Sequence, residues 1–346
     1  MGSRGELTGR SGFLPDRIIH LHPTRLCNLT CLHCYSTSAP SYTEALDADV
    51  LCEALGVLRA EGYTQVSLSG GEPLVYKPLR RLVERAHELR FRVTVVTNGL
   101  LAQKRLGPML PLLDGIAVSF DGLPDRHNAM RGREDAFDRA AAGLRWLAEQ
   151  GAPVGAAISL TRDGIPELPE LADRLVELGA RAIQVRPVAR AGRARELASS
   201  SFHDASDRAR LYLVVLALQM ELPEVRMHCD LAPAQGLWGQ RDAYAGLLAD
   251  CDDASHADRP LADLVNPLVI TDTGALKPIA YDFDVRFDVG SLEGLSQEAL
   301  RSYKQERADG LRALVGGALA GMADRNDLVD WFDHCARLSE VAPLAA

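Results

Sequence analysis

Residues 27–34 read CNLTCLHC, and this stretch decides the interpretation of the whole chain. Its cysteines, Cys27, Cys31 and Cys34, can bind three irons of a cubane cluster from one short loop. The fourth iron then has no protein ligand, so a substrate or cofactor can coordinate it, whereas an electron carrier usually has a cysteine on every iron. The spacing therefore favours a catalytic iron–sulfur cluster on these three residues.

Two other interpretations of the cysteines stay open. The loop could bind zinc with His33 as a fourth ligand, although the spacing does not match the usual two pairs of ligands in a structural zinc site. The cysteines could also be three unrelated buried thiols, which is hard to reconcile with so polar a loop. Seven cysteines in a reducing compartment are not expected to form a set of disulfides.

The sequence around this loop alternates short apolar runs with amphipathic stretches. This alternation predicts a parallel sheet covered by helices, and hence an α/β fold. The predicted strands are Ile18–Leu21, Gln65–Leu68, Arg92–Thr97, Gly115–Phe120, Val154–Leu160 and Ala182–Val188. The predicted helices between them are Ala45–Ala60, Leu79–Leu89, Leu101–Leu113, Ala136–Gln150 and Leu168–Leu178.

The Cys-x3-Cys-x2-Cys spacing directly after the first strand resembles the signature of the radical S-adenosylmethionine (SAM) superfamily. This resemblance implies a partial (β/α)6 TIM-like barrel and a [4Fe–4S] cluster whose open iron binds SAM. It also implies that one electron, from a reductant such as flavodoxin or ferredoxin, cleaves SAM to methionine and a 5′-deoxyadenosyl radical. That radical abstracts a hydrogen atom from the substrate, while the protein positions the cofactor and prevents side reactions.

Further motifs at the ends of the predicted strands are similar to SAM contacts of the family. Glycines let a backbone approach a ligand closely, the carboxyl ends of barrel strands are where active sites form, and a guanidinium pairs well with a carboxylate. Turn chemistry for the Asn-Gly and Asp-Gly pairs, and a surface salt bridge for the arginine, are the structural alternatives. The expected SAM contacts are Gly70, Gly71, Glu72, Pro73, Asn98, Ser119, Asp121, Arg131 and Ser159.

The C-terminal part departs from the family pattern. Residues 267–283 resemble the hairpin of the SPASM and twitch branches, which carry auxiliary clusters, but Ile279 occupies the position of the hairpin cysteine. Cys229, Cys251 and Cys335 are widely separated, so they are too few for a second four-cysteine cluster. A three-cysteine site and ordinary buried thiols both remain open.

Three regions are expected: a flexible tail at 1–16, the barrel at 17–195, and a degenerate SPASM- or twitch-like region at 196–346 with a hairpin and helices. Within the last region, residues 203–221 are predicted to be helical, residues 297–339 mostly helical, and residues 222–260 irregular. The branch resemblance implies that the chain modifies a ribosomally synthesised peptide or natural-product precursor. Only 26 residues precede Cys27, so a separate leader-peptide recognition protein is expected.

Composition limits the partners. The net charge is −9, which does not suit nucleic acid or an anionic membrane. The sequence has neither a signal peptide nor an apolar run long enough to span a bilayer, so a cytoplasmic location is expected. Two alternative functions remain: a decarboxylase, dehydrogenase or epimerase of a small sugar- or nucleoside-type metabolite, and a non-catalytic iron–sulfur or zinc protein.

Overall fold

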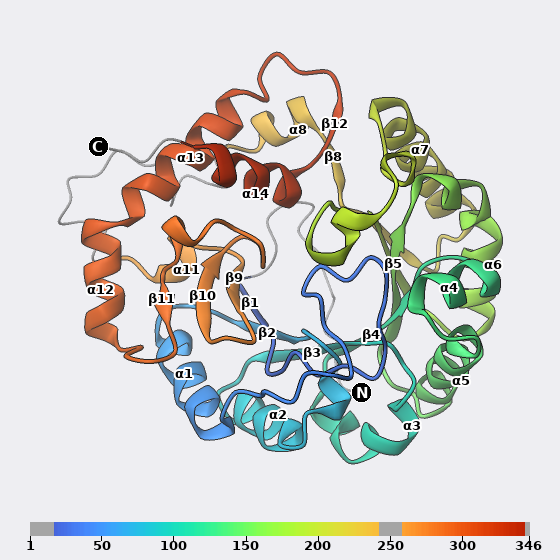
Figure 1. The fold of residues 1–346 in the computed structure, drawn as a ribbon, viewed down its shortest axis with the longest axis horizontal. Helices are drawn as coiled ribbons and strands as arrows, with labels where there is room; N and C mark the ends of the chain where they lie inside the picture. Colours follow the sequence, from blue (N-terminus) through green and yellow to red (C-terminus); the bar gives the residue numbers. More distant parts are fainter. Residues whose placement is uncertain (1–16, 242–257, 343–346) are drawn as a thin grey trace, which may run out of the picture.

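The computed structural model describes residues 17–241 and 258–342 (Figure 1). Seven parallel strands form the wall of an open barrel and follow one another in chain order. Side-by-side pairing of consecutive strands requires a crossover between each pair, and helices supply most of these crossovers. The strands are β1 (Ile18–Leu21), β2 (Gln65–Leu68), β3 (Arg92–Thr97), β4 (Gly115–Phe120), β5 (Val154–Leu160), β6 (Ala182–Pro187) and β7 (Arg226–Cys229).

Helices cover the outside of this wall (Figure 1). Strand β4 shows why: Ile116, Val118 and Phe120 are buried, whereas the alternate residues are half-exposed. The buried face packs against helices, and the other face lines the hollow of the barrel. The covering helices are α1 (Ala48–Ala60), α2 (Leu79–Glu88), α3 (Ala102–Arg105), α4 (Pro124–Arg131), α5 (Ala136–Glu149), α6 (Leu168–Glu177) and α7 (Ala205–Glu221).

The predicted parallel sheet and partial barrel are confirmed, with two local differences. The predicted helix at 101–113 is only the short α3 followed by a 3-10 segment at Gly107–Leu112, because Pro108 and Pro111 cannot continue an α-helix. The prediction of irregular structure throughout 222–260 is wrong. Strand β7 pairs in parallel with β6, and β8 (Leu231–Pro233) and α8 (Ala234–Gly239) follow it.

The C-terminal region continues the barrel sheet. The predicted hairpin is β9 (Leu268–Ile270) and β10 (Ala275–Pro278), and β9 pairs in parallel with β1 on the side opposite β2. A short strand, β11 (Gly290–Ser291), completes this edge. The remaining elements are α11 (Leu261–Leu264), α12 (Gln297–Glu306), α13 (Ala308–Ala320), α14 (Trp331–Val341) and β12 (Leu328–Asp330), which pairs with β8.

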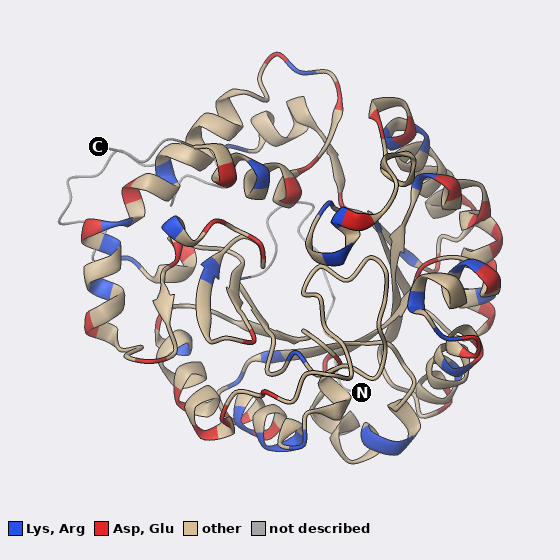
Figure 2. Cartoon of the chain, viewed as in Figure 1, with Lys and Arg blue, Asp and Glu red and all other residues tan. Residues whose placement is uncertain are grey.

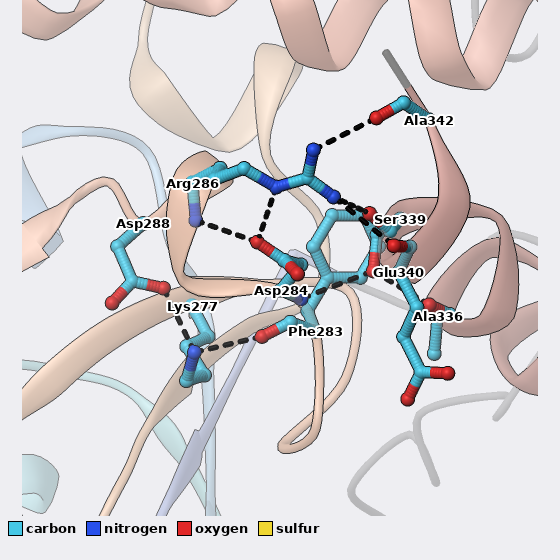
Figure 3. Close-up of polar contacts among 9 residues, drawn as sticks. All are labelled: Lys277, Phe283, Asp284, Arg286, Asp288, Ala336, Ser339, Glu340 and Ala342. Carbon is cyan, nitrogen blue, oxygen red and sulfur yellow. Dashed lines mark hydrogen bonds and ion pairs between the residues drawn. The ribbon is translucent and has the colours of Figure 1, made fainter. Parts of the chain in front are cut away.

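Polar contacts join this region together. Figure 3 shows Arg286 donating hydrogen bonds to the backbone oxygens of Ser339 and Ala342, at the C-terminal end of α14. A cation there offsets carbonyls that have no partner within the helix. Farther along, Lys304 of α12 donates to the Glu61 carboxylate at 3.0 Å, and these two side chains are only 5% and 7% exposed. That buried pair attaches the C-terminal helices to the end of α1.

Within the described ranges, the helices are either too short or too polar to cross a lipid bilayer.

Candidate functional site

The cysteine loop lies at the carboxyl end of β1, over the mouth of the barrel (Figure 1). Cys27 and Cys31 are buried and Cys34 is half-buried, and they form a small cluster with Leu29 and Leu100 apart from the main core. Residues 26–43 contain no Asp, Glu, Lys or Arg, so the loop is uncharged along its length (Figure 2). The three thiols therefore lie in an uncharged loop, packed against apolar side chains, at the end of the barrel where active sites form.

The environment of the thiols fits a cluster of metal and sulfide. Burial raises the pKa of Cys27 to about 12 and that of Cys31 to about 11, so both stay protonated unless a cation displaces the proton. The backbone N–H of Ser38 donates to Cys34 Sγ at 3.3 Å, a contact that supports a coordinated thiolate. In the described parts, no three His, Cys, Asp or Glu side chains are arranged to hold a single metal ion, whereas a cubane cluster is bound by one cysteine on each iron.

Arg193, in the segment after β6, forms hydrogen bonds with the backbone of the cysteine loop. Its guanidinium donates to the backbone oxygens of Cys31 at 2.9 Å, Thr37 at 3.1 Å and Ser38 at 2.6 Å. The adjacent Gly192 adopts a φ of +52°, and a Cβ there would lie 2.6 Å from the Tyr35 carbonyl carbon. A guanidinium supplies several donors in a fixed plane, so one side chain bonds three carbonyls from two parts of the loop.

The loop Gly70–Pro73 forms backbone hydrogen bonds with the residues just before Cys27. The N–H of Gly71 donates to Thr24 O and that of Glu72 to Leu26 O, each at 3.0 Å. A Cβ at Gly71 would lie 2.8 Å from the Leu26 carbonyl carbon, well inside van der Waals contact. Position 71 therefore requires glycine, because the backbone of Leu26, the residue before Cys27, leaves no room for a Cβ.

The carboxylate of Glu72 is buried and has three donors from this chain. They are Leu74 N–H at 3.0 Å, the Thr97 hydroxyl at 2.7 Å and Asn98 N–H at 2.8 Å. Burial raises the pKa of Glu72, while these hydrogen bonds oppose the shift. Asn98 in turn donates its side-chain amide to Asn28 Oδ1 at 2.7 Å. Glu72 and Asn98 thus connect β2, β3 and the cysteine loop.

Asp121 and Arg131 face each other beside Cys31. Arg131 donates to both carboxylate oxygens of Asp121, at 2.5 and 3.0 Å, and His33 Nε2 lies 3.1 Å from the same carboxylate. Burial opposes ionisation, yet the Arg131 guanidinium and His33 hold the pKa of Asp121 well below its usual range. The remaining Nη1 of Arg131 lies 4.0 Å from Cys31 Sγ. The structure therefore brings together two predicted SAM contacts and His33, which the sequence considered only as a possible zinc ligand.

Ser119 on β4 and Ser159 on β5 lie on the half-exposed face of the sheet that lines the barrel. The pairing of Ser119 with Ala157, and of Ser159 with Arg186, places these two side chains on that same face, two positions apart. Both predicted residues thus face the hollow in which a ligand above the cysteines would extend.

Sequence reasoning missed an aromatic group beside the cysteine loop. The Tyr35 hydroxyl lies 3.2 Å from His22 Nε2, and the His22 ring stacks on Tyr281 from the C-terminal hairpin with centroids 5.1 Å apart. Burial lowers the pKa of His22 to about 3, so the ring is neutral. The sequence signals are the position of Tyr35 directly after Cys34 and that of Tyr281 after the predicted hairpin.

A charged group inside the barrel was also missed. Arg186 of β6 pairs with Asp230 at 3.1 Å, and Gln184 donates to the same carboxylate at 2.8 Å. Arg186 is 48% exposed although it points into the barrel, as expected beside a hollow. Nearby, burial and the Asp230 charge raise the pKa of Asp330 to about 7. The signal was lost because Asp230 follows β7, in a segment predicted to be irregular.

The cysteines considered for a second cluster are dispersed. Cys335 is buried in α14, and Cys229 is half-buried in β7. Cys251 lies outside the described residues. Ile279, at the position of the hairpin cysteine, is buried with a φ of +66°.

Comparison with known proteins finds similar sequences. The family model described as "Radical SAM superfamily" matches residues 21–179. The sporulation killing factor maturation protein SkfB of Bacillus subtilis is 29% identical over 51% of this chain and 43% of its own length. The pre-heme d1 synthase of Dinoroseobacter shibae is 30% identical over 67% of this chain and 57% of its own length. The chain therefore spans about half the length of the curated relatives it matches.

Solved structures share the fold. SuiB of Streptococcus suis, bound to S-adenosylmethionine, aligns over 87% of this chain and 68% of its own, with a TM-score of 0.62 and 17% identity. The enzyme anSMEcpe with bound AdoMet aligns over 86% of this chain and 83% of its own, with a TM-score of 0.61 and 14% identity.

Proposed function

Because residues 21–179 form a radical SAM domain, we propose that this chain reductively cleaves S-adenosylmethionine at a [4Fe–4S] cluster and abstracts a hydrogen atom from its substrate. Cys27, Cys31 and Cys34 are the proposed cluster ligands. The observation that carries the proposal is their placement together in one loop without charged residues at the mouth of a parallel barrel. When bound, the cluster and SAM supply the electron transfer and the radical.

The chain's own residues hold this pocket in shape. Arg193 fixes the outer turn of the cysteine loop, while Gly71 and Glu72 fix its start. Buried and hydrogen-bonded groups move little, which keeps reacting atoms at a constant separation. The proposed SAM contacts lie around the pocket: the backbone of 70–73 and 98, the Nη1 of Arg131, and the side chains on the lumen face of β4 and β5.

The proposed substrate is a ribosomally synthesised peptide. SkfB is named as a maturation protein for a killing factor, and SuiB has been solved with its precursor peptide SuiA. A peptide would enter the barrel mouth between the cysteine loop and the C-terminal region. A reductant such as flavodoxin or ferredoxin, a separate leader-peptide recognition protein and a cytoplasmic location complete this proposal.

A second candidate substrate is a small metabolite. Two relatives carry names of that kind, the Fe-coproporphyrin III synthase of Methanosarcina barkeri and the pre-heme d1 synthase of Dinoroseobacter shibae. The charged group at Arg186 and Asp230 inside the barrel would suit a polar molecule of limited size.

The decisive experiment is anaerobic reconstitution with iron and sulfide, followed by SAM and dithionite. We expect about four irons per chain and the formation of 5′-deoxyadenosine. Replacing Cys27, Cys31 and Cys34 by alanine should abolish both, whereas replacing Cys52 on α1 should change neither. A preparation that retains its iron in the triple variant, or that forms no 5′-deoxyadenosine, would contradict the proposal. Incubation with candidate peptides and metabolites, followed by mass spectrometry, then separates the two substrate classes.

A further inference from the structure

A polar cavity of about 480 Å³ lies beside the barrel, apart from the cysteine loop. Its walls come from the end of β6 and the residues up to Arg190, from the start of α7, and from β12 and α14. The barrel and the C-terminal region therefore both contribute to it. A volume of this size is ordinary for a small-molecule or side-chain binding site.

Three side chains at this cavity have an unmet polar atom or charge among the described residues: two have buried nitrogens without a hydrogen bond, and the third, Arg190, is exposed. Both ring nitrogens of His203 are buried without a hydrogen bond, and so is the Nε of Arg208. Arg190 has no carboxylate partner; its guanidinium instead lies over the Phe202 ring, 3.9 Å from the centroid. Buried polar groups are rarely left unpaired, because removing them from water without a hydrogen-bond partner is unfavourable. Their convergence on one cavity indicates a missing ligand.

The charged side chains of the cavity wall indicate the charge of the missing ligand. The other arginines of the wall already have carboxylate partners. These pairs are Arg162 with Asp207 at 3.0 Å, Arg325 with Asp327 at 2.7 Å, and Arg337 with Asp333. Among the acidic residues of the wall, Asp330 has a pKa raised to about 7 by burial and by Asp230, so it carries only part of a charge near neutral pH. Arg190 is then the cation without a carboxylate partner among the described residues, while Arg208 donates to the His203 backbone oxygen at 3.4 Å and lies 3.9 Å from the Asp327 carboxylate.

We propose that this cavity binds a carboxylate of the substrate peptide, with Arg190, His203 and Arg208 as its contacts. A guanidinium and a neutral imidazole N–H both donate to a carboxylate, and Arg208 adds a second guanidinium. Burial lowers the pKa of His203, which favours the neutral ring that can donate without a counter-ion. This inference deepens the proposed function, on which it rests, by naming the substrate class as an acidic peptide.

The position of the cavity supports a role in presenting the substrate. Asp330 lines it, and the charge of Asp330 also acts on Arg186 inside the barrel, while the Asp230 charge acts on Asp330 in return. A peptide held at Arg190 could therefore extend past Asp330 into the barrel. Such an anchor outside the reaction centre would fix the register of the chain without contacting the reacting atoms.

The test is fluorescence polarisation with the full chain, reconstituted without oxygen. The probes are tetramethylrhodamine-labelled tetraglutamate and tetraglutamine peptides. We expect the wild type to prefer the glutamate peptide, and Arg190→Ala and His203→Ala each to weaken its binding by about tenfold or more. Arg190→Lys should recover part of the loss, since it keeps the charge but not the planar fork. Arg145→Ala, on the exposed side of α5, is the matched control.

Each outcome decides a separate point. Equal binding of the two peptides, or unchanged binding in Arg190→Ala and His203→Ala, overturns the cavity assignment. Thermal unfolding of each variant separates loss of a contact from loss of the fold. SAM cleavage without peptide, measured in the same samples, tests the proposed function independently: if it is absent while the glutamate peptide still binds through Arg190, the proposed function fails and the cavity assignment stands.

Discussion

Replacing Gly71 by alanine should displace the start of the cysteine loop. The added Cβ would lie 2.8 Å from the Leu26 carbonyl carbon and 2.9 Å from that of Arg25. Carbon atoms in contact are about 3.8 Å apart, so one of the two backbones must move by roughly 1 Å. Both partners are backbone and cannot rotate away. The φ of Gly71 is not in the left-handed region, so the effect is purely steric.

The expected cost combines two contributions. Overpacking costs about 1–3 kcal/mol, and separating the loops weakens the hydrogen bonds from Gly71 to Thr24 and from Glu72 to Leu26, about 1 kcal/mol each. The free energy of unfolding should therefore fall by about 2–5 kcal/mol, measured by denaturant unfolding of the iron-free protein. Iron and sulfide content after anaerobic reconstitution should fall as well, because Cys27 is the next residue after Leu26.

Gly317→Ala is the matched control for this variant. Gly317 lies in α13, a methyl group added there would have no atom within 4 Å, and its φ is not positive. Alanine there should be neutral or stabilising by up to about 1 kcal/mol. Wild-type stability together with wild-type iron content in Gly71→Ala would refute the reasoning.

The remaining predictions concern other contacts. Arg193→Ala removes a charged donor from three carbonyls of the cysteine loop, so the reconstituted protein should lose iron faster to a chelator. Arg193→Lys should lose it at an intermediate rate, and equal rates in all three proteins would show that Arg193 does not hold the loop. Lys304→Met leaves the Glu61 carboxylate buried without its cation and should lower the free energy of unfolding by about 3–5 kcal/mol, with partial recovery on adding Glu61→Gln. Asp330 has a folded pKa of about 7, above its ordinary 3.8, so between these pH values only the folded state binds its proton. The free energy of unfolding should therefore fall as pH rises from about 4 to 7 and be constant above pH 7. Asp330→Asn can still cap α14 and should reduce this fall, as measured by urea titrations at several pH values. An identical pH profile in the variant would show that Asp330 is not the cause.

The sequence predicts the barrel well because its signals are local. Strands such as Arg92–Thr97 are rich in valine and threonine, and helices such as Ala136–Glu149 have clear periodicity and end near a glycine. Strand β7 was missed because Arg226–Cys229 is short and mostly polar, with side chains alternately exposed and half-exposed. Its strand character comes from pairing with β6, which no local pattern reports.

Contacts between distant segments explain what else the sequence could not predict. Arg193 contacts Cys31 across 162 positions, and in the sequence it was one of several arginines in a loop. Its role depends on Gly192, whose close approach to the cysteine loop brings the guanidinium over three carbonyls. The residues around Arg193 in the sequence do not distinguish it from Arg190 or Arg195.

The residues proposed to contact SAM also form hydrogen bonds within the protein around the cysteine loop. These existing bonds limit how a ligand can bind to them. Glu72 already accepts three hydrogen bonds from the chain, so a ligand amine would have to share its carboxylate with Thr97 and Asn98. Arg131 gives two donors to Asp121 and keeps Nη1 near Cys31 Sγ. A ligand carboxylate beside the cysteines can therefore engage Arg131 without breaking its buried pair, whose loss would leave Asp121 uncompensated. The pocket is thus arranged before any ligand arrives, since the groups that would contact SAM are already held by one another.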